Sequence, residues 1–188
     1  MNKTDQQRTR QITTWLKQDM LRMKALECVR LLGLPDCYIA AGFLRNLVWD
    51  HQHDKPNATP LNDVDVIYFD KKEPQPARYL HYEQLLKAML PQVQWQVRNQ
   101  ARMHVRNGDA PYHSSLDAMR YWPEKETAVA VRLLDDGSLD YLAAFDFNSL
   151  FAGKVTHNPR RDYAIFVQRV NTKGWLNQWP KLRLFSLR

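Results

Sequence analysis

The feature that most constrains the fold is a pair of short apolar runs with a glycine turn between them. The first run, residues 38–41, leads directly into Gly42, and the second occupies residues 62–69. Between them, residues 43–50 place apolar side chains at three- and four-residue steps, the period of a helix. The polar, proline-containing stretch that follows has the composition of a loop. The order predicts strand, turn, helix, loop and returning strand, an α/β arrangement.

The turn at Gly42 predicts an anion site. The backbone N–H groups at the start of a helix have no intrahelical acceptor, and together with the helix dipole they stabilise a phosphate. Small side chains at Ala41 and Gly42 leave room for that approach. Arg45, one turn into the helix, is positioned to add a bidentate donor for the same anion.

The returning run carries paired carboxylates. In a strand, residues i and i+2 project to the same face, so Asp63 and Asp65 stand side by side while Val64, Val66 and Tyr68 face the other way. Adjacent carboxylates repel unless a cation lies between them, and hard oxygen ligands suit Mg²⁺ or Mn²⁺. We interpret the pair as metal ligands. The alternative is a pair of exposed acids on an edge strand.

The net charge of +7 is concentrated in one region. Residues 1–150 hold 19 basic and 19 acidic side chains, whereas residues 151–188 hold 8 basic side chains and only Asp162 as an acid. This excess predicts either RNA binding through the C-terminal region or a solvated basic tail. Trp175 and Trp179, in the same region, either stack on bases or cover a small core.

The length of 188 residues and a hydrophobic content of 44% fit one domain spanning 1–188, with a helical N-terminal region (1–34) that breaks near Asp19 and a basic, helical C-terminal region (151–188). No apolar run approaches the roughly 20 residues of a spanning helix, so we expect a cytoplasmic protein without membrane association. Cys28 and Cys37 are interpreted as reduced, buried side chains.

The residues of the turn and the acidic strand resemble a known superfamily. Residues 41–46, Ala-Gly-Phe-Leu-Arg-Asn, are similar to the turn of the DNA polymerase β-like nucleotidyltransferases, and Asp63-Val64-Asp65-Val66 is similar to their acidic strand. A closer resemblance is to small bacterial nucleotidyltransferase family proteins. It extends through residues 95–104, 127–133, 158–160 and 175–180.

This resemblance implies an α/β (α+β) fold with a small mixed sheet flanked by helices and with helical additions at both ends. It also implies transfer of a nucleoside monophosphate from a nucleoside triphosphate to an acceptor hydroxyl, with Mg²⁺ or Mn²⁺ on Asp63 and Asp65 and with pyrophosphate release. Ala41 and Asn46 depart from the Gly-Gly-x-x-Arg-Asp form of the turn.

Residues beyond the turn extend the predicted nucleotide site. Together with Ala41, Gly42, Arg45 and Asn46, the side chains of Asn99 and Arg102 are candidates to orient ribose, phosphate or acceptor. The alternative is that the segment from residue 99 to 104 forms a hydrogen-bonded loop that braces the core.

A third carboxylate is absent from the position where the superfamily often has one. The strand expected over residues 93–97 offers Gln94 and Gln96, and an amide cannot act as a base. Three outcomes stay open: Asp117 or Asp140 is brought in by the fold, two carboxylates suffice, or the protein binds nucleotides without turnover. The alternatives to a nucleotidyltransferase are therefore a catalytically degenerate nucleotide- or RNA-binding protein on the same fold, and an Asp-x-Asp glycosyltransferase.

Overall fold

A computed structural model of the chain describes residues 3–186. The predicted N- and C-terminal regions include residues 1–2 and 187–188, which lie outside the described range. The helices are α1 (Lys3–Gln18), α2 (Met20–Leu31), α3 (Gly42–Gln52), α4 (Arg78–Met89), α5 (Gln100–Asn107), α6 (Ser115–Met119), α7 (Asn148–Phe151), α8 (Tyr163–Lys173) and α9 (Trp175–Gln178), with a 3₁₀ turn at Lys125–Thr127. The strands are β1 (Tyr38–Ala40), β2 (Val64–Tyr68), β3 (Trp95–Asn99), β4 (Val129–Leu133), β5 (Leu139–Ala143), β6 (Lys154–Thr156) and β7 (Arg183–Phe185).

The N-terminal residues form two helices that break where the sequence predicts. Asp19 is the N-cap of α2, and its side chain accepts a hydrogen bond of 3.0 Å from the Arg22 backbone N–H. The apolar stripe, with Ile12, Leu16 and Leu26 fully buried, packs into the core. No helix among residues 3–186 combines the length and the apolar content that crossing a bilayer requires.

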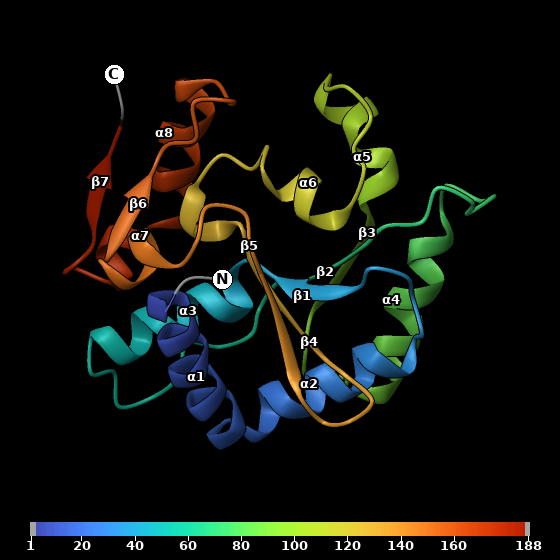
Figure 1. Cartoon of the computed structure of the whole chain (residues 1–188), viewed down its shortest axis with the longest axis horizontal. Coiled ribbons are helices and arrows are strands. Elements are labelled where there is room, and N and C mark those ends of the chain that lie inside the picture. Colours follow the sequence, from blue (N-terminus) through green and yellow to red (C-terminus); the bar gives the residue numbers. More distant parts are fainter. Residues whose placement is uncertain (1–2, 187–188) are drawn as a thin grey trace.

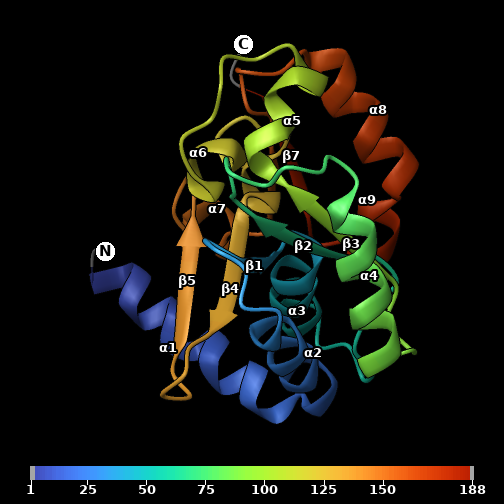
Figure 2. The same ribbon diagram turned by 90° about the vertical axis from the view of Figure 1, so that its right-hand side faces the viewer.

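The centre of the molecule is a mixed five-stranded sheet in the order β3-β2-β1-β4-β5. The pair β2–β3 is parallel and the other neighbours are antiparallel, so Asp65 on β2 lies opposite Ala40 on β1 and Gln96 on β3. Helices α2, α3 and α4 contact one face of the sheet (Figures 1 and 2). Val64 and Val66 face this helical layer in the main core, which leaves Asp65 on the other face, as the strand alternation predicts.

The predicted hairpin is also present. Strands β4 and β5 pair antiparallel from Val129 opposite Ala143 to Leu133 opposite Leu139, and the Asp-Asp-Gly-Ser sequence forms the turn. Gly137 adopts a φ of +79° there, a conformation that glycine reaches without steric cost. The predicted mixed sheet flanked by helices is therefore confirmed.

Two segments differ from the expectation. The C-terminal region is not wholly helical, because β6 and β7 form a separate two-stranded parallel sheet. These strands lie far apart in sequence with α8 and α9 between them, so no local pattern reveals their pairing. Residues 100–107 form a helix instead of a loop, capped by the Asn99 side chain at one end and by Gly108 at φ +70° at the other.

The turn before α3 holds Ala41 in a backbone conformation that glycine favours. Ala41 has φ +56° and ψ −122°, its N–H donates to the Val129 carbonyl at 2.9 Å, and its side chain is buried. A non-glycine residue with positive φ stores on the order of 1 kcal/mol or more of strain. The strain explains why the superfamily form of this turn, which the sequence resembles, has glycine here.

We expect Ala41→Gly to raise the free energy of unfolding by about 1 kcal/mol, because it relieves this strain. Urea denaturation measures the change. Ala40→Gly is the matched control, since Ala40 is buried in a regular strand and its replacement should destabilise the protein. A loss of stability in Ala41→Gly similar to that of the control would contradict the assignment of strain.

Candidate functional site

A cleft of about 320 Å³ opens where α3 begins beside the N-terminal end of β2. Six residues predicted from the sequence line it together: Ala41, Gly42, Arg45, Asn46, Asp63 and Asp65. The other walls come from the loop before β2 and from the C-terminal helices, through Thr59, Pro60, Leu61, Asn62, Arg169, Lys173, Trp175, Gln178 and Trp179. The structure thus brings the turn and the acidic strand into one site.

The two carboxylates at this site have different surroundings. Asp63 is exposed and lies 3.7 Å from the Lys173 ammonium, and the Gln96 amide N–H donates to it at 3.4 Å. Asp65 is half-buried, and burial raises its pKa; the Arg45 guanidinium opposes this effect and the Asp63 charge adds to it. Ionised Asp65 is therefore stabilised by any cation that enters the cleft.

The raised pKa of Asp65 predicts how the stability of the protein changes with pH. Because the folded state holds the Asp65 proton more tightly than the unfolded state, the contribution of Asp65 to stability is full below the unfolded pKa near 4 and is lost as pH rises through the folded pKa. We expect Asp65→Asn to be more stable than the wild type at pH 7 and to lose that advantage near pH 3.5. Urea denaturation at both pH values measures it, and the exposed Asp63→Asn is the control. An Asp65→Asn variant less stable at pH 7 would contradict the burial argument.

The donor set fits a magnesium ion that arrives with phosphates. Among residues 3–186 no group of three histidine, cysteine, aspartate or glutamate side chains gathers to hold a metal alone. Mg²⁺ commonly binds one or two carboxylates and completes its shell with water and substrate phosphates. Asp63 and Asp65 supply two carboxylates facing one cleft, and Gln96 occupies the neighbouring position on β3.

The N-terminus of α3 points into the same cleft. The Ala41 carbonyl accepts from the N–H groups of Leu44 and Arg45, and the N–H groups of Gly42 and Phe43 belong to the unpaired first turn. A Cβ atom at Gly42 would lie 3.4 Å from the side-chain nitrogens of Arg45 and Asn46. Glycine here therefore keeps space for these two side chains as well as for an anion.

Arg45 is more enclosed than the sequence predicts. Its Nη1 donates to Thr127 Oγ1 at 2.8 Å, and its Nε and Nη2 donate to Asn46 Oδ1 at 3.2 and 3.0 Å. The guanidinium lies over the rings of Trp49 and Trp175, and burial lowers its pKa to about 10, so that it stays charged at neutral pH. It contributes a fixed positive charge beside Asp65.

Sequence reasoning did not assign two further cations to this site. Arg169 and Lys173 lie four residues apart on α8, on one helix face, and both line the cleft. Glu124, fully buried, holds Arg169 by accepting from its Nε at 2.6 Å. The i, i+4 spacing of the two cations is visible in the sequence, but it does not reveal that this face of α8 lines the cleft, with Lys173 close to Asp63.

Two predicted residues lie elsewhere. Asn99 is buried as the cap of α5, where its amide donates to the Asp70 carbonyl at 2.8 Å and to Glu73 at 3.1 Å. Arg102 donates to the Glu73 carbonyl and lines a different hollow. The structure does not bring either side chain to the cleft. Their hydrogen bonds agree with the alternative given above, in which this segment braces the core. Asp117 and Asp140 are not among the lining residues either.

The loop that carries Thr59 is tied to the cleft by Asp50, on the last turn of α3. The buried Asp50 carboxylate accepts from the Thr59 N–H at 2.7 Å, from Thr59 Oγ1 at 2.7 Å and from Trp179 Nε1 at 2.8 Å. One side chain therefore joins α3, the loop before β2 and the C-terminal segment. Trp175 and Trp179 are buried, which makes them core residues and not exposed stacking platforms for bases.

Comparison with known proteins identifies this architecture as the fold of the DNA polymerase β-like nucleotidyltransferases. The chain belongs to a family of nucleotidyltransferases, because a family model with the description "Nucleotidyltransferase" matches residues 27–184. No curated protein matches the sequence.

Two solved structures are similar to this chain. A structure described as revealing a CCA-adding enzyme head domain is 30% identical with a TM-score of 0.83, and the match covers 95% of this chain and 96% of that one. A CCA-adding enzyme in complex with CTP is 13% identical with a TM-score of 0.61, covering 92% of this chain and 43% of that one; it shows the fold alone.

Proposed function

We propose that the protein is a metal-dependent nucleotidyltransferase that moves a nucleoside monophosphate from a nucleoside triphosphate to an acceptor oxygen and releases pyrophosphate. The observation that carries the proposal is the convergence of two carboxylates, a helix N-terminus and accessible cations on one cleft. The family assignment and the likeness to a CCA-adding enzyme head domain support the same class of reaction.

Each group has a role in this proposal. The N–H groups of Gly42 and Phe43 would hold a phosphate, with Arg169 and Lys173 as further partners for the triphosphate. Asp63 and Asp65 would hold Mg²⁺ or Mn²⁺, which when bound neutralises charge on the triphosphate and the leaving pyrophosphate. The Lys173 ammonium is paired with Asp63 in this structure. When metal and nucleotide bind, it would leave Asp63 and contact a phosphate.

A second candidate function rests on Gln96. Because the β3 residue opposite Asp65 is an amide, which donates to Asp63, the protein could retain nucleotide or RNA binding on this fold without turnover. RNA as a further partner would contact the exposed Arg160 and Arg183 of the C-terminal region, since Arg161, Arg169, Lys173 and Lys181 all form ion pairs within the molecule.

Pyrophosphate release separates the two candidates. The protein is incubated with each of the four ribonucleoside triphosphates, Mg²⁺ or Mn²⁺ and a panel of acceptors, and pyrophosphate is measured by an enzyme-coupled assay. A transferase releases pyrophosphate only when metal and acceptor are both present. Nucleotide binding with no pyrophosphate from any acceptor would favour the binding protein.

A further inference from the structure

A second cleft, of about 700 Å³, continues from the first along the exposed face of the sheet. The two clefts share Ala41, Asp65, Gln96, Thr127 and Arg169. From Asp65 and Gln96 the second cleft follows the register to Ile67 and Arg98, the next pair on the same face of β2 and β3. Its position beside the proposed nucleotide site makes it the place for the acceptor, and its volume is that of a small-molecule site.

The second cleft is lined by arginines, three of which also pair with acids outside the lining: Arg98 with Glu83, Arg161 with Asp109 and Arg169 with Glu124. Arg98, Arg106, Arg161 and Arg169 line it, and Asp65 is the only acid among the described lining residues. Arg106 is exposed on α5 and makes no ion pair within residues 3–186. A site of this kind favours an anion, because guanidinium groups bind phosphate through paired hydrogen bonds.

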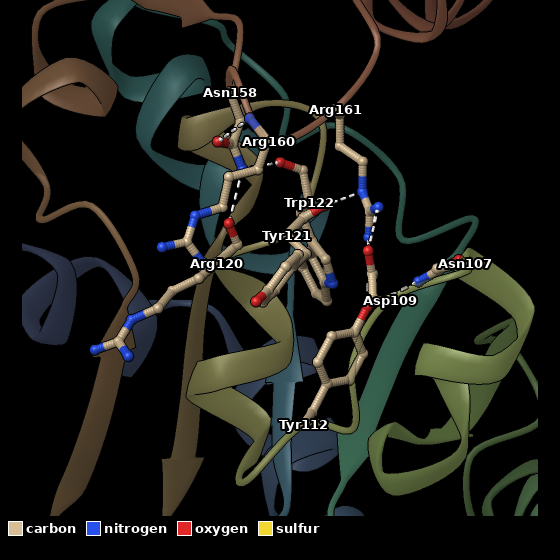
Figure 3. Close-up of polar contacts among 9 residues, drawn as sticks. All are labelled: Asn107, Asp109, Tyr112, Arg120, Tyr121, Trp122, Asn158, Arg160 and Arg161. Carbon is tan, nitrogen blue, oxygen red and sulfur yellow. Dashed lines mark hydrogen bonds and ion pairs between the residues drawn. The ribbon is translucent and has the colours of Figure 1, made fainter.

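The Tyr121–Trp122 side of the second cleft is held by residues far apart in sequence (Figure 3). Arg161 Nε donates to the Tyr121 carbonyl at 2.5 Å, and its Nη atoms donate to Asp109 at 2.9 and 2.5 Å. Asn158 Nδ2 donates to the carbonyls of Arg120 and Trp122, both at 2.8 Å. These bonds fix the segment of Tyr121 and Trp122 as a preformed side of the cleft.

Outside the proposed metal site, no carboxylate or histidine among the described residues lines either cleft to deprotonate an acceptor hydroxyl, and the Lys173 ammonium is paired with Asp63. Among the described residues, Asp63 and Asp65 are the only carboxylates that line either cleft, both in the proposed metal site, and no histidine lines them. The β3 residue paired with Asp65 is Gln96, whose amide cannot accept a proton at neutral pH. An acceptor whose attacking oxygen is already ionised needs no such base.

Building on the proposed function, we infer that the acceptor is a small phosphomonoester bound in the second cleft. An ionised phosphate oxygen attacks the α-phosphorus, a new P–O–P bond forms, and the bond from the α-phosphorus to the α–β bridging oxygen breaks with loss of pyrophosphate. No proton is transferred in this step. The product is a diphosphate that joins the nucleoside to the acceptor.

The test compares glycerol 3-phosphate, glycerol and ³²P-labelled inorganic phosphate as acceptors for the full chain with nucleoside triphosphate and Mg²⁺ or Mn²⁺. We expect products from glycerol 3-phosphate that resist alkaline phosphatase, because a P–O–P link has no terminal phosphate, and nucleoside diphosphate labelled in its β-phosphate from inorganic phosphate. We also expect kcat/KM to level off above about pH 7, since the second pKa of a phosphomonoester is about 6.

Variants locate the acceptor. Arg106→Gln should raise the KM for glycerol 3-phosphate about tenfold and leave nucleotide affinity intact, because it removes a charged donor from the second cleft only. Arg10→Gln is the matched control, an exposed arginine on helix α1 that lines neither cleft, and it should leave both constants unchanged.

Two results would overturn the inference while sparing the proposed function. One is product from glycerol alone, or phosphatase-sensitive product from glycerol 3-phosphate, with a rate that climbs into the alkaline range. The other is nucleotide binding with no phosphate acceptor labelled. Failure to bind any nucleoside triphosphate with metal would overturn both proposals together.

Discussion

Replacing Asp63 and Asp65 together by asparagine is expected to lower acceptor-dependent pyrophosphate release on the order of 10³-fold or more. The two side chains are the only carboxylates facing the cleft among the described residues. Asparagine keeps their size but removes the negative charge that would hold the divalent cation against the triphosphate. The loss should appear in kcat and in nucleotide affinity, because the ion would contact both the bound triphosphate and the leaving group.

The stability of this variant is its control. Because ionised Asp65 costs folding stability in the metal-free protein, the double variant should unfold at a urea concentration no lower than that of the wild type at pH 7. If the variant is well folded and pyrophosphate release is lost, the loss results from the change at the site and not from unfolding. Retention of activity within a few-fold would contradict the assignment of the two aspartates as metal ligands.

Asp50→Asn is expected to lower the free energy of unfolding by about 2 to 3 kcal/mol. The carboxylate accepts three hydrogen bonds, and the amide places an NH₂ group opposite a donor, either the Thr59 N–H or the Trp179 indole N–H. Trp179 is almost fully buried, so an unpaired indole N–H there has no water to replace Asp50. Urea denaturation of the metal-free protein measures the loss.

Asp54→Asn is the matched control for this prediction. Asp54 lies four residues further along the chain, is exposed and pairs with Lys181 at 3.2 Å. An exposed ion pair contributes about 1 kcal/mol at most, so the control should stay near wild-type stability. Equal effects in the two variants would show that the network around Asp50 does not hold the loop and the C-terminal segment against α3.

The parts of the fold that the sequence predicts are those with local patterns. The strand, glycine turn and helix around Gly42 show a change from a short apolar run to helical spacing, and the i, i+2 spacing of Asp63 and Asp65 fixes their common face. The helix α5 also had local signals, Asn99 as N-cap and Gly108 as C-cap, which the polar composition of the segment obscured.

The rest of the site depends on long-range packing. Arg169 and Lys173 line the cleft only because tertiary packing brings one face of α8 to it, and Thr127 contacts Arg45 across 82 positions of sequence. The sequence predicted Arg45 as a bidentate phosphate donor, but it gave no sign that the rings of Trp49 and Trp175 enclose the guanidinium in the folded chain. Such contacts have no period or spacing that a single sequence displays.

The strain at Ala41 and the burial of Asp65 are both located at the cleft. Each reduces the stability of the free protein, and each lies where a phosphate or a cation would bind. Binding at these positions would compensate the cost of Asp65 ionisation, since a divalent cation favours the charged carboxylate. Proteins commonly concentrate such unfavourable features at functional sites.

Equilibrium titration shows whether the cleft binds a nucleoside triphosphate through a metal on Asp63 and Asp65. Each of the four nucleoside triphosphates is titrated into the wild-type protein and into the Asp63→Asn/Asp65→Asn variant, with Mg²⁺ or Mn²⁺ and with a chelator. We predict metal-dependent binding to the wild type for at least one nucleotide, and binding to the variant that is weak and the same with metal or chelator. Equal affinity for the two proteins in the presence of metal would contradict the claim.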